Sequence, residues 1–359
     1  MVLRGGTGDN PTHPKEASTH LESQDIPEEK YVETQSPASL QLIFGADLAW
    51  AETILKAKYR PKRRPPHPPL AMFKALIYQR LKQIPSWRKL ASTLKVDPDL
   101  TTQLGFRKSP SFDSLSEFAI RIGDEALEEL FLGFVARIRE YLPDFGRNVV
   151  AVDATLVRGY SKPRPRRYRK TDPDTTWGVS GEKFGKPLYV YGYKLQVISD
   201  AHYELPISFV VAPANRSEMT LFADHLKQLL TQGDKPQVLL ADAGYDSKRN
   251  ALLCLKNGIA PVIAINPRRT GKKKRRADYL LPIQRDSELW GYYYSKRSAA
   301  ERLFSRLKLE LGLLHIKRRT LSKVRFHFTM CLIAMLMVAL ASLSNGRAEL
   351  SLSVEQWRY

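Results

Sequence analysis

Cysteine is nearly absent from this chain, since Cys254 and Cys331 are the only two in 359 residues. Both stand among apolar residues, which predicts buried, reduced thiols and a cytoplasmic protein rather than a disulfide-bonded secreted one. The seven histidines do not cluster with the cysteines, so we expect no zinc site. The first residues contain no apolar run, so no signal peptide is expected.

Long hydrophobic runs are equally scarce. The strongly apolar stretch Thr329–Leu343 is shorter than the roughly 20 residues that span a bilayer. Arg325, His327 and Arg347 flank it closely. We therefore predict a buried helix here, with a membrane span as the minor alternative.

Acidic residues are too few to balance the basic ones: 37 Asp and Glu stand against 57 Lys and Arg, a net charge of +20. Such a surplus indicates a polyanionic partner, either nucleic acid or an anionic membrane. Cations gather at Ser161–Lys170, with six, and at Arg268–Arg276, with seven. Both segments are predicted to be loops, and Lys272, Lys273 and Lys274 in the second are expected to contact DNA phosphates. The first segment has no assigned role.

The N-terminal part of the chain divides into a tail and a helical region. Residues 1–38 are polar and rich in acids, which is typical of a disordered tail. Residues 39–145 show helical periodicity, with helices expected at 70–84, at 86–95 and from 111 onward. Short helices with basic residues resemble a helix-turn-helix module, although any small helical bundle has this pattern. The charge of the whole chain favours DNA binding by this region.

The pattern changes to β-rich runs between residues 146 and 345. Strands are expected at 148–157, 188–198, 205–211, 237–241 and 260–265, with helices between the later ones. This order indicates an α/β fold in which helices cover the faces of a sheet. Residues 346–359 form a C-terminal tail.

Two aspartates stand out within these predicted strands. Asp153 lies in the middle of an apolar run, where a carboxylate is costly unless it is paired or bound to a metal. Asp242 ends a buried strand, the usual position of a site in an open α/β sheet. Structural alternatives remain for each, a strand-edge hydrogen bond for Asp153 and a helix cap for Asp242. For the nearby Asp246 we favour the capping interpretation.

The stretch from Tyr294 to Lys308 brings further polar residues together. Tyr294, Arg297, Glu301 and Lys308 would fall within an arc of about 60° on a single helix, beside an apolar stripe. The structural alternative concerns Glu301, which stands three residues after Ser298 in the spacing of a capping box.

Three carboxylates suit Mg²⁺ or Mn²⁺, which favour oxygen ligands. Two such ions activate an attacking oxygen and stabilise a leaving one in phosphodiester cleavage. Nucleic acid supplies the phosphodiester, and the net positive charge supplies affinity for it.

With these residues in place, the chain resembles the bacterial insertion-sequence transposases. Asp153, Asp242 and Glu301 look like their DDE triad, and Tyr294, Arg297, Glu301 and Lys308 match the YREK signature of one large group. The resemblance covers about residues 70–345. It implies a ribonuclease H-like catalytic core, a mixed sheet with flanking helices, preceded by a helical region that binds terminal inverted repeats.

The resemblance also implies roles for the residues. Asp153, Asp242 and Glu301 would hold two Mg²⁺ ions, for which Mn²⁺ would substitute. Arg297 and Lys308 would bind phosphates of double-stranded DNA, with Tyr294 packing or hydrogen-bonding beside them. The expected reaction is cut-and-paste transposition, in which water cleaves the element end and the freed 3′-hydroxyl attacks target DNA. A dimer is expected in the synaptic complex, in the cytoplasm and associated with the nucleoid.

Three alternatives stay open at this point. A metal-dependent nuclease without strand transfer would use the same residues. A DNA-binding regulator without catalysis would need none of them, and a tyrosine recombinase acting through Tyr294 would need no metal. Trp177, which has polar neighbours, is either a base-stacking residue or an ordinary core or surface side chain.

Overall fold

A computed structural model describes residues 43–59, 65–165, 171–183, 186–266, 281–285 and 287–357. Three of the features predicted above lie outside these residues. They are the tail at 1–38, the cations Lys272, Lys273 and Lys274, and residues 166–170 of the first basic segment. The chain divides into two compact units, Met1–Thr34 and Gln35–Tyr359, and all that follows concerns the second.

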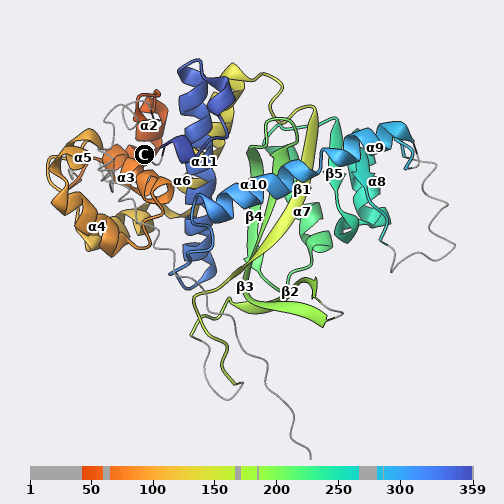
Figure 1. Ribbon diagram of the computed structural model, residues 1–359, viewed down its shortest axis with the longest axis horizontal. Helices are drawn as coiled ribbons and strands as arrows, with labels where there is room; N and C mark the ends of the chain where they lie inside the picture. The colour runs from red at the N-terminus through yellow and green to blue at the C-terminus, as the bar shows by residue number, and fades with distance from the viewer. Residues whose placement is uncertain are drawn as a thin grey trace, which may run out of the picture. The chain divides into compact units, whose positions relative to one another are not determined.

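One mixed sheet of six strands organises the described part of the chain (Figure 1). The strands are β1 (Val149–Arg158), β2 (Thr176–Lys183), β3 (Lys186–Asp200), β4 (Pro206–Pro213), β5 (Val238–Ala241) and β6 (Ala260–Ile263). β1 lies between β3, to which it is antiparallel, and β5, to which it is parallel. β6 continues the parallel pairing beyond β5, and β4 is antiparallel to β3. β1 and the strands from β3 to β6 agree with the five runs expected from the sequence, whereas β2 was not expected.

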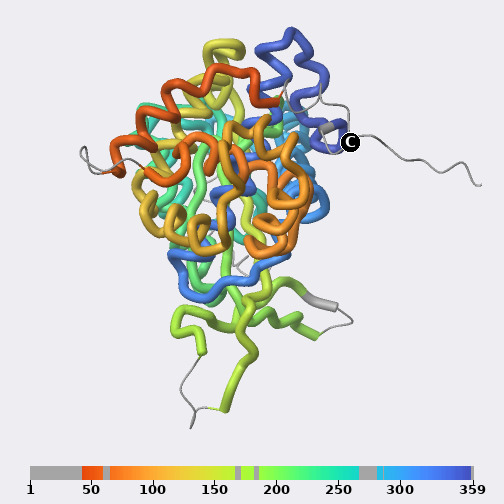
Figure 2. Tube along the Cα trace, turned by 90° about the vertical axis from the view of Figure 1, so that its left-hand side faces the viewer, coloured from red at the N-terminus to blue at the C-terminus, as the bar shows by residue number. Residues whose placement is uncertain are grey.

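The β2–β3 hairpin extends beyond the other strands (Figures 1 and 2). β2 pairs with the first half of β3, and Trp177 lies opposite Tyr191 in the register. The ring centroids of these two residues are 5.2 Å apart, and Trp177 keeps 52% of its surface exposed. Trp177 is therefore a surface residue that packs on one neighbour, and its base-stacking role stays a prediction.

Within the described residues, five helices precede the sheet. They are α2 (Ala49–Ala57), α3 (Pro69–Leu81), α4 (Trp87–Val96), α5 (Pro98–Gln103) and α6 (Phe112–Tyr141). Local chemistry explains where they start, because Ser86 and Ser111 accept hydrogen bonds from the first turns of α4 and α6. α6 runs much further than the helix expected from residue 111, with a kink at Gly123, whose φ is +67°.

Helix α11 (Leu321–Ser344) joins the helical region to the sheet. It packs against α3, α6 and β4, and its residues belong to the same hydrophobic core as Phe73, Phe134 and Phe209. A helix that is apolar on all sides must be covered on all sides. Although α11 is long and apolar enough to cross a membrane, 94% of its most apolar window is buried within the protein. The prediction of a buried helix is confirmed.

The remaining helices border the sheet. They are α7 (Glu218–Thr231), the short 3₁₀ helix η1 (Ala243–Tyr245), α8 (Lys248–Lys256), α9 (Glu288–Ser295) and α10 (Ser298–Leu309). α10 crosses β1 and β3 (Figure 1). Beneath α9 and α10 lies a small apolar cluster that includes Ala151, Leu240, Ala299 and Ala300. This cluster identifies the face of β1 and β5 that α10 covers.

Two 3₁₀ turns follow α11, η4 (Ala348–Leu350) and η5 (Glu355–Trp357). Val354 between them is fully buried, so the segment after α11 packs onto the core.

Candidate active site

Asp153 and Asp242 lie side by side at one end of the central parallel strands. In the β1–β5 register Val152 pairs with Ala241, so each aspartate is the next residue along its strand. Side chains alternate between the two faces of a strand. Ala151 and Leu240 point toward α10, and so do the aspartates two residues after each. The strand register therefore places these two carboxylates on neighbouring strands.

Each aspartate uses one carboxylate oxygen in a hydrogen bond to a nearby backbone amide. Oδ1 of Asp153 accepts a hydrogen bond of 2.8 Å from the amide of Ala154, and Oδ1 of Asp242 accepts one of 2.8 Å from Gly244. No described residue donates to the Oδ2 atoms. Burial raises the pKa of Asp153 to about 6, and the negative charges of Asp242 and Glu218 contribute to this shift. The raised pKa means that the ionised form of Asp153 is destabilised, and a cation bound between the two aspartates would stabilise it.

Glu218 is a fourth carboxylate, which sequence reasoning missed. It begins α7, and Oε1 accepts a hydrogen bond of 2.8 Å from the buried ammonium of Lys194 on β3. A Cβ atom built on Gly244 would be 2.9 Å from Oδ1 of Asp242 and 3.3 Å from Oε2 of Glu218. Gly244 therefore stands between these two carboxylates, and Glu218 belongs to the same cluster of acids.

A buried polar network supports the cluster from beneath. The side-chain amide of Gln196 donates to the hydroxyl oxygen of Tyr245, at 3.0 Å, and to the backbone oxygen of Glu218, at 3.3 Å. Its carbonyl oxygen lies 3.0 Å from Nδ1 of His225, whose Nε2 lies 3.1 Å from Ser208. Because the network joins β3, β4, α7 and η1, it holds Glu218 and the segment after β5 in fixed positions.

The signature residues from Tyr294 to Lys308 lie on two helices rather than one. Tyr294 belongs to α9, where its ring stacks on Trp290 at a centroid distance of 4.5 Å. Arg297 precedes the first turn of α10 with helical backbone angles and makes no side-chain cap. The capping-box interpretation of Glu301 is therefore wrong, because Ser298 is already inside the helix. Glu301 instead accepts a 2.5 Å hydrogen bond from the guanidinium of Arg297.

Glu301 is not yet gathered with the aspartates. Its side chain is 56% exposed and is bonded to Arg297. In the described part of the chain no three Asp, Glu, His or Cys side chains stand close enough together to hold a metal ion. The positive charge of Arg297 does reach Asp153, whose pKa it lowers against the effect of burial. Arg297 therefore lies between the two parts of the predicted triad.

Lys308 also lies near Asp153. Burial lowers the pKa of its ammonium, and the charge of Asp153 partly offsets this. Lys308 has no carboxylate partner at ion-pair distance among the described residues. A half-buried cation beside the carboxylate cluster is placed to bind an anion.

Two arginines fix α10 in place over the sheet. Arg302 and Arg306 bind the two carboxylate oxygens of Glu204, at 2.5 Å and 2.7 Å, in the turn after β3. Leu303 and Leu307 on an adjoining face of the helix are fully buried. α10 is thus held both by its apolar face and by a charged clamp.

Asp246 has a structural role, although it does not cap the next helix as expected. It accepts a hydrogen bond of 2.9 Å from the amide of Asn266 and lies 3.7 Å from the guanidinium of Arg285. Ser247 caps α8 instead.

Two family models match this chain. The model described as "Transposase DDE domain" matches residues 144–337, which is more than half of the chain and contains both aspartates and all of α10. The chain belongs to the DDE transposase family. A second model, described as "Transposase domain (DUF772)", matches residues 39–121 in the helical region. The predicted ribonuclease H-like class, a mixed sheet with flanking helices, is confirmed.

Some solved transposase structures are distantly similar. A piggyBac transposase synaptic complex with hairpin DNA shares 13% identity, with 90% of this chain and 78% of that chain covered and a TM-score of 0.43. A pre-cleavage Mos1 transpososome also shares 13% identity, with 63% and 79% covered and a TM-score of 0.22. No curated protein matches the chain.

Substitution of Gly244 by Ala is expected to reduce DNA cleavage by this transposase about 10–100-fold while leaving the fold intact. The new Cβ would push Asp242 and Glu218 apart, and a displacement of about 1 Å in an active site has an effect of this size. Gly244 lacks a positive φ, so the backbone accepts Ala. Initial cleavage rates and thermal melting would be measured together.

Gly291→Ala in α9 is the matched control, because its Cβ would meet nothing within 4 Å. Cleavage should be unchanged, and a Gly-to-Ala change within a helix stabilises by up to about 1 kcal/mol. Normal cleavage by Gly244→Ala would show that the reaction does not depend on the spacing of these carboxylates.

Proposed function

We propose that this protein is a cut-and-paste DNA transposase that binds the terminal inverted repeats of an insertion sequence and catalyses metal-dependent cleavage and strand transfer. The observation that carries the proposal is the position of Asp153 and Asp242. They lie side by side at the ends of two parallel strands, each with a free oxygen, under a helix that carries Arg297, Glu301 and Lys308.

Asp153, Asp242 and Glu301 are the residues that would hold the divalent metal. Two observations support a metal at this site. The Oδ2 atoms accept no hydrogen bond from a described residue, and carboxylate oxygens are the preferred ligands of Mg²⁺. The raised pKa of Asp153 shows that its charge is not balanced by the protein. When bound, two Mg²⁺ ions, or Mn²⁺ in their place, polarise the phosphodiester and favour both the attacking and the leaving oxygen.

The ion pair between Arg297 and Glu301 is the element that must rearrange. Glu301 is exposed and its partner lies near Asp153, so opening this pair turns the carboxylate toward the aspartates. The guanidinium then becomes free to hold a phosphate by two hydrogen bonds. Each group thereby exchanges one partner of opposite charge for another.

The other residues around the cluster position the DNA and the acids. Lys308 binds a phosphate beside Asp153, which fits its half-buried ammonium, for which the described residues offer no carboxylate at ion-pair distance. Tyr294, stacked on Trp290, supports Arg297, whose guanidinium carbon lies 5.7 Å from the ring centroid of Tyr294. Glu218, held by Lys194, keeps the negative potential at Asp153 high and so favours cations there.

The partner is double-stranded DNA, first the element ends and then the target. The net charge of +20 supplies non-specific affinity, and Lys272, Lys273 and Lys274 contribute to it. The helical region, residues 39–145, contacts the inverted repeats, and the protein acts as a dimer in the synapse. The protein acts in the bacterial cytoplasm, in association with the nucleoid.

The test of this function is a strand-transfer assay with the full chain, paired DNA ends taken from the flanks of its gene, and a supercoiled target plasmid. We expect cleavage at the element end and joined products, both abolished by EDTA. Cleavage without joining would identify a nuclease instead. Binding without cleavage in Mg²⁺ or Mn²⁺ would identify a regulator, and joining that survives EDTA would identify a metal-independent recombinase.

A further inference from the structure

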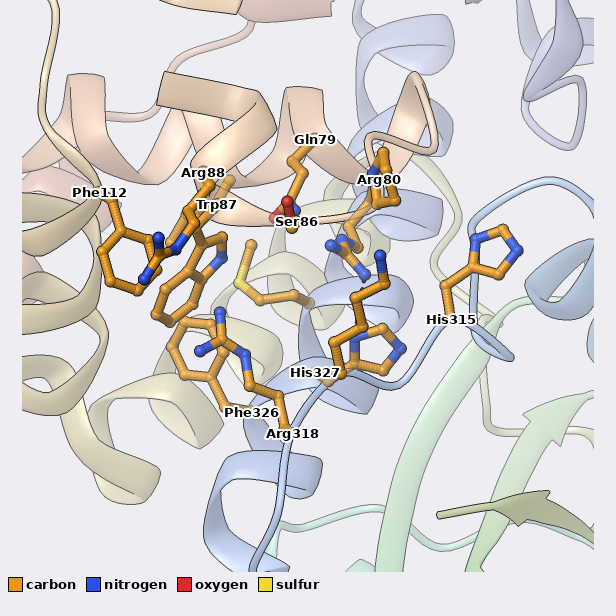
Figure 3. A pocket seen from close by; sticks show the side chains of 14 residues that line it. Gln79, Arg80, Ser86, Trp87, Arg88, Phe112, His315, Arg318, Phe326 and His327 are labelled. Atoms are coloured by element: carbon orange, nitrogen blue, oxygen red, sulfur yellow. Dashed lines mark hydrogen bonds between the residues drawn. The ribbon is translucent and has the colours of Figure 1, made fainter. Parts of the chain in front are cut away.

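A second cationic site lies away from the carboxylates, in a cavity of about 190 Å³ between α3, the start of α4 and the segment that leads into α11 (Figure 3). Its lining contains no Asp or Glu but four cations, Arg80, Arg88, Lys317 and Arg318, and two histidines, His315 and His327. We call it the arginine pocket. A concave site with cations and no acid suits an anion.

Arg80 is the most deeply placed of these cations. It ends α3, is only 8% exposed, and has no carboxylate partner at ion-pair distance among the described residues. Its guanidinium lies 3.0 Å from Nδ1 of His327, whose Nε2 lies 3.1 Å from the carbonyl oxygen of Leu313. Because Arg80 only donates, His327 is the neutral tautomer that accepts at Nδ1 and donates from Nε2. A buried guanidinium is thus held in place without being neutralised.

Aromatic rings position two further arginines. The guanidinium carbon of Arg318 lies 3.3 Å from the centroid of the Trp87 ring, and that of Arg88 lies 4.8 Å from Phe112. Figure 3 shows Arg80 and Arg318 entering the pocket from different walls, with the guanidinium of Arg318 beside the ring of Trp87. Burial and, to a smaller extent, the charge of Arg80 lower the pKa of Arg318 to about 10. These cations repel one another, so an anion between them would be stabilising.

The start of α4 adds to the same potential. Pro85, Ser86 and Trp87 line the pocket, and Ser86 is the N-cap of this ten-residue helix. The N-terminal end of a helix carries a partial positive charge. The pocket is smaller than the roughly 300 Å³ typical of sites for drug-sized ligands, so it suits a single phosphate group rather than a whole nucleotide.

We propose that the arginine pocket binds one backbone phosphate of DNA. The inference rests on the proposed function, which makes DNA the polyanion that this chain meets. The pocket is built from α3 and α4 on one side and from residues 315–318, which follow α10, on the other. A phosphate held there therefore ties the DNA to the helical region and to the segment next to the catalytic helix at once.

The test measures how DNA affinity depends on salt, with the full-length protein and a labelled duplex of arbitrary sequence. Arg318→Gln should make the log–log slope shallower by about 0.9, the value for one phosphate contact. The double variant Arg88→Gln, Arg318→Gln should show the same change and no more, because both side chains serve one phosphate. Arg137→Gln is the matched control, since Arg137 is already paired with Glu140 on α6.

Three results would overturn the inference, each read on variants whose melting temperature shows that they are folded. The first is an unchanged slope in the double variant, and the second is an additive change of about 1.8. The third is saturable stabilisation by inorganic phosphate, against chloride at equal ionic strength, that Arg318→Gln abolishes while its DNA slope stays unchanged. That result would assign the pocket to free phosphate. A wild-type protein that binds no DNA would instead contradict the proposed function.

Discussion

Replacement of Asp153 by Asn is expected to abolish DNA cleavage and, at the same time, to stabilise the metal-free protein. The loss of a charged metal ligand should lower the cleavage rate by at least about 10³-fold, which is several kcal/mol of transition-state stabilisation. Burial raises the pKa of Asp153 to about 6, so the ionised side chain costs folding free energy at neutral pH. From the difference between this value and the ordinary pKa, removing the charge should stabilise by about 2–3 kcal/mol.

The sign of the pH dependence follows from the same shift. Because the folded-state pKa of Asp153 is raised, its contribution to stability is fully present below the unfolded pKa of about 4 and is lost as the pH rises through about 6. Chemical denaturation of the wild type and Asp153→Asn at pH 4.5 and pH 7.5, in EDTA, would measure this. Asp153→Asn should raise the free energy of unfolding at pH 7.5 but not at pH 4.5.

The matched control is Asp224→Asn, an exposed acid on α7, which should change neither cleavage nor stability noticeably. Asp153→Asn that cleaves normally would remove Asp153 from the site. An inactive Asp153→Asn variant that is no more stable than the wild type at pH 7.5 would show that a partner already neutralises this carboxylate.

Glu301→Gln is expected to lower cleavage by about 10³-fold or more with almost no change in stability. In the structure Glu301 contacts Arg297 on a partly exposed helix surface, and such ion pairs contribute about 0–1 kcal/mol. The large effect on activity comes from the rearranged state, in which the carboxylate joins the aspartates. Single-turnover cleavage and thermal melting would be compared, and DNA binding should be retained.

Glu140→Gln on α6 is a closely matched control. Glu140 is 57% exposed and is bonded to Arg137 at 2.6 Å, much as Glu301 is bonded to Arg297. It should leave cleavage unchanged. Should Glu301→Gln cleave normally while Glu218→Gln does not, Glu218 would replace Glu301 as the third acid of the site.

Much of this site could be predicted from local pattern. An apolar run interrupted by Asp153, and a short buried strand that ends at Asp242, each predict a strand because alternation and β-branched residues are local properties. The start of α4 was equally readable, since Pro85 and Ser86 act on the next few residues only. The family resemblance added the pairing of these aspartates with Glu301.

The capping box failed for a reason that lies outside the four-residue motif. Ser298 and Glu301 have the right spacing, but the backbone at Arg297 is already helical because α9 ends only two residues earlier. Ser298 therefore sits inside α10, and Glu301 meets the cation at the preceding turn. Whether a capping box forms depends on the backbone conformation of the residues before it, which the four residues of the motif do not determine.

Sequence by itself determined the charge of this protein, most of its strands, and the two aspartates at the ends of theirs. The strands and the aspartates could be predicted because they depend on neighbours within a few residues. Tertiary structure alone decided which distant residues meet. The parallel crossover through α7 places Glu218 beside Asp242, and the packing of α11 against α3 and α6 brings Arg318 to Arg80. Such contacts join residues tens to hundreds of positions apart, so no local pattern records them.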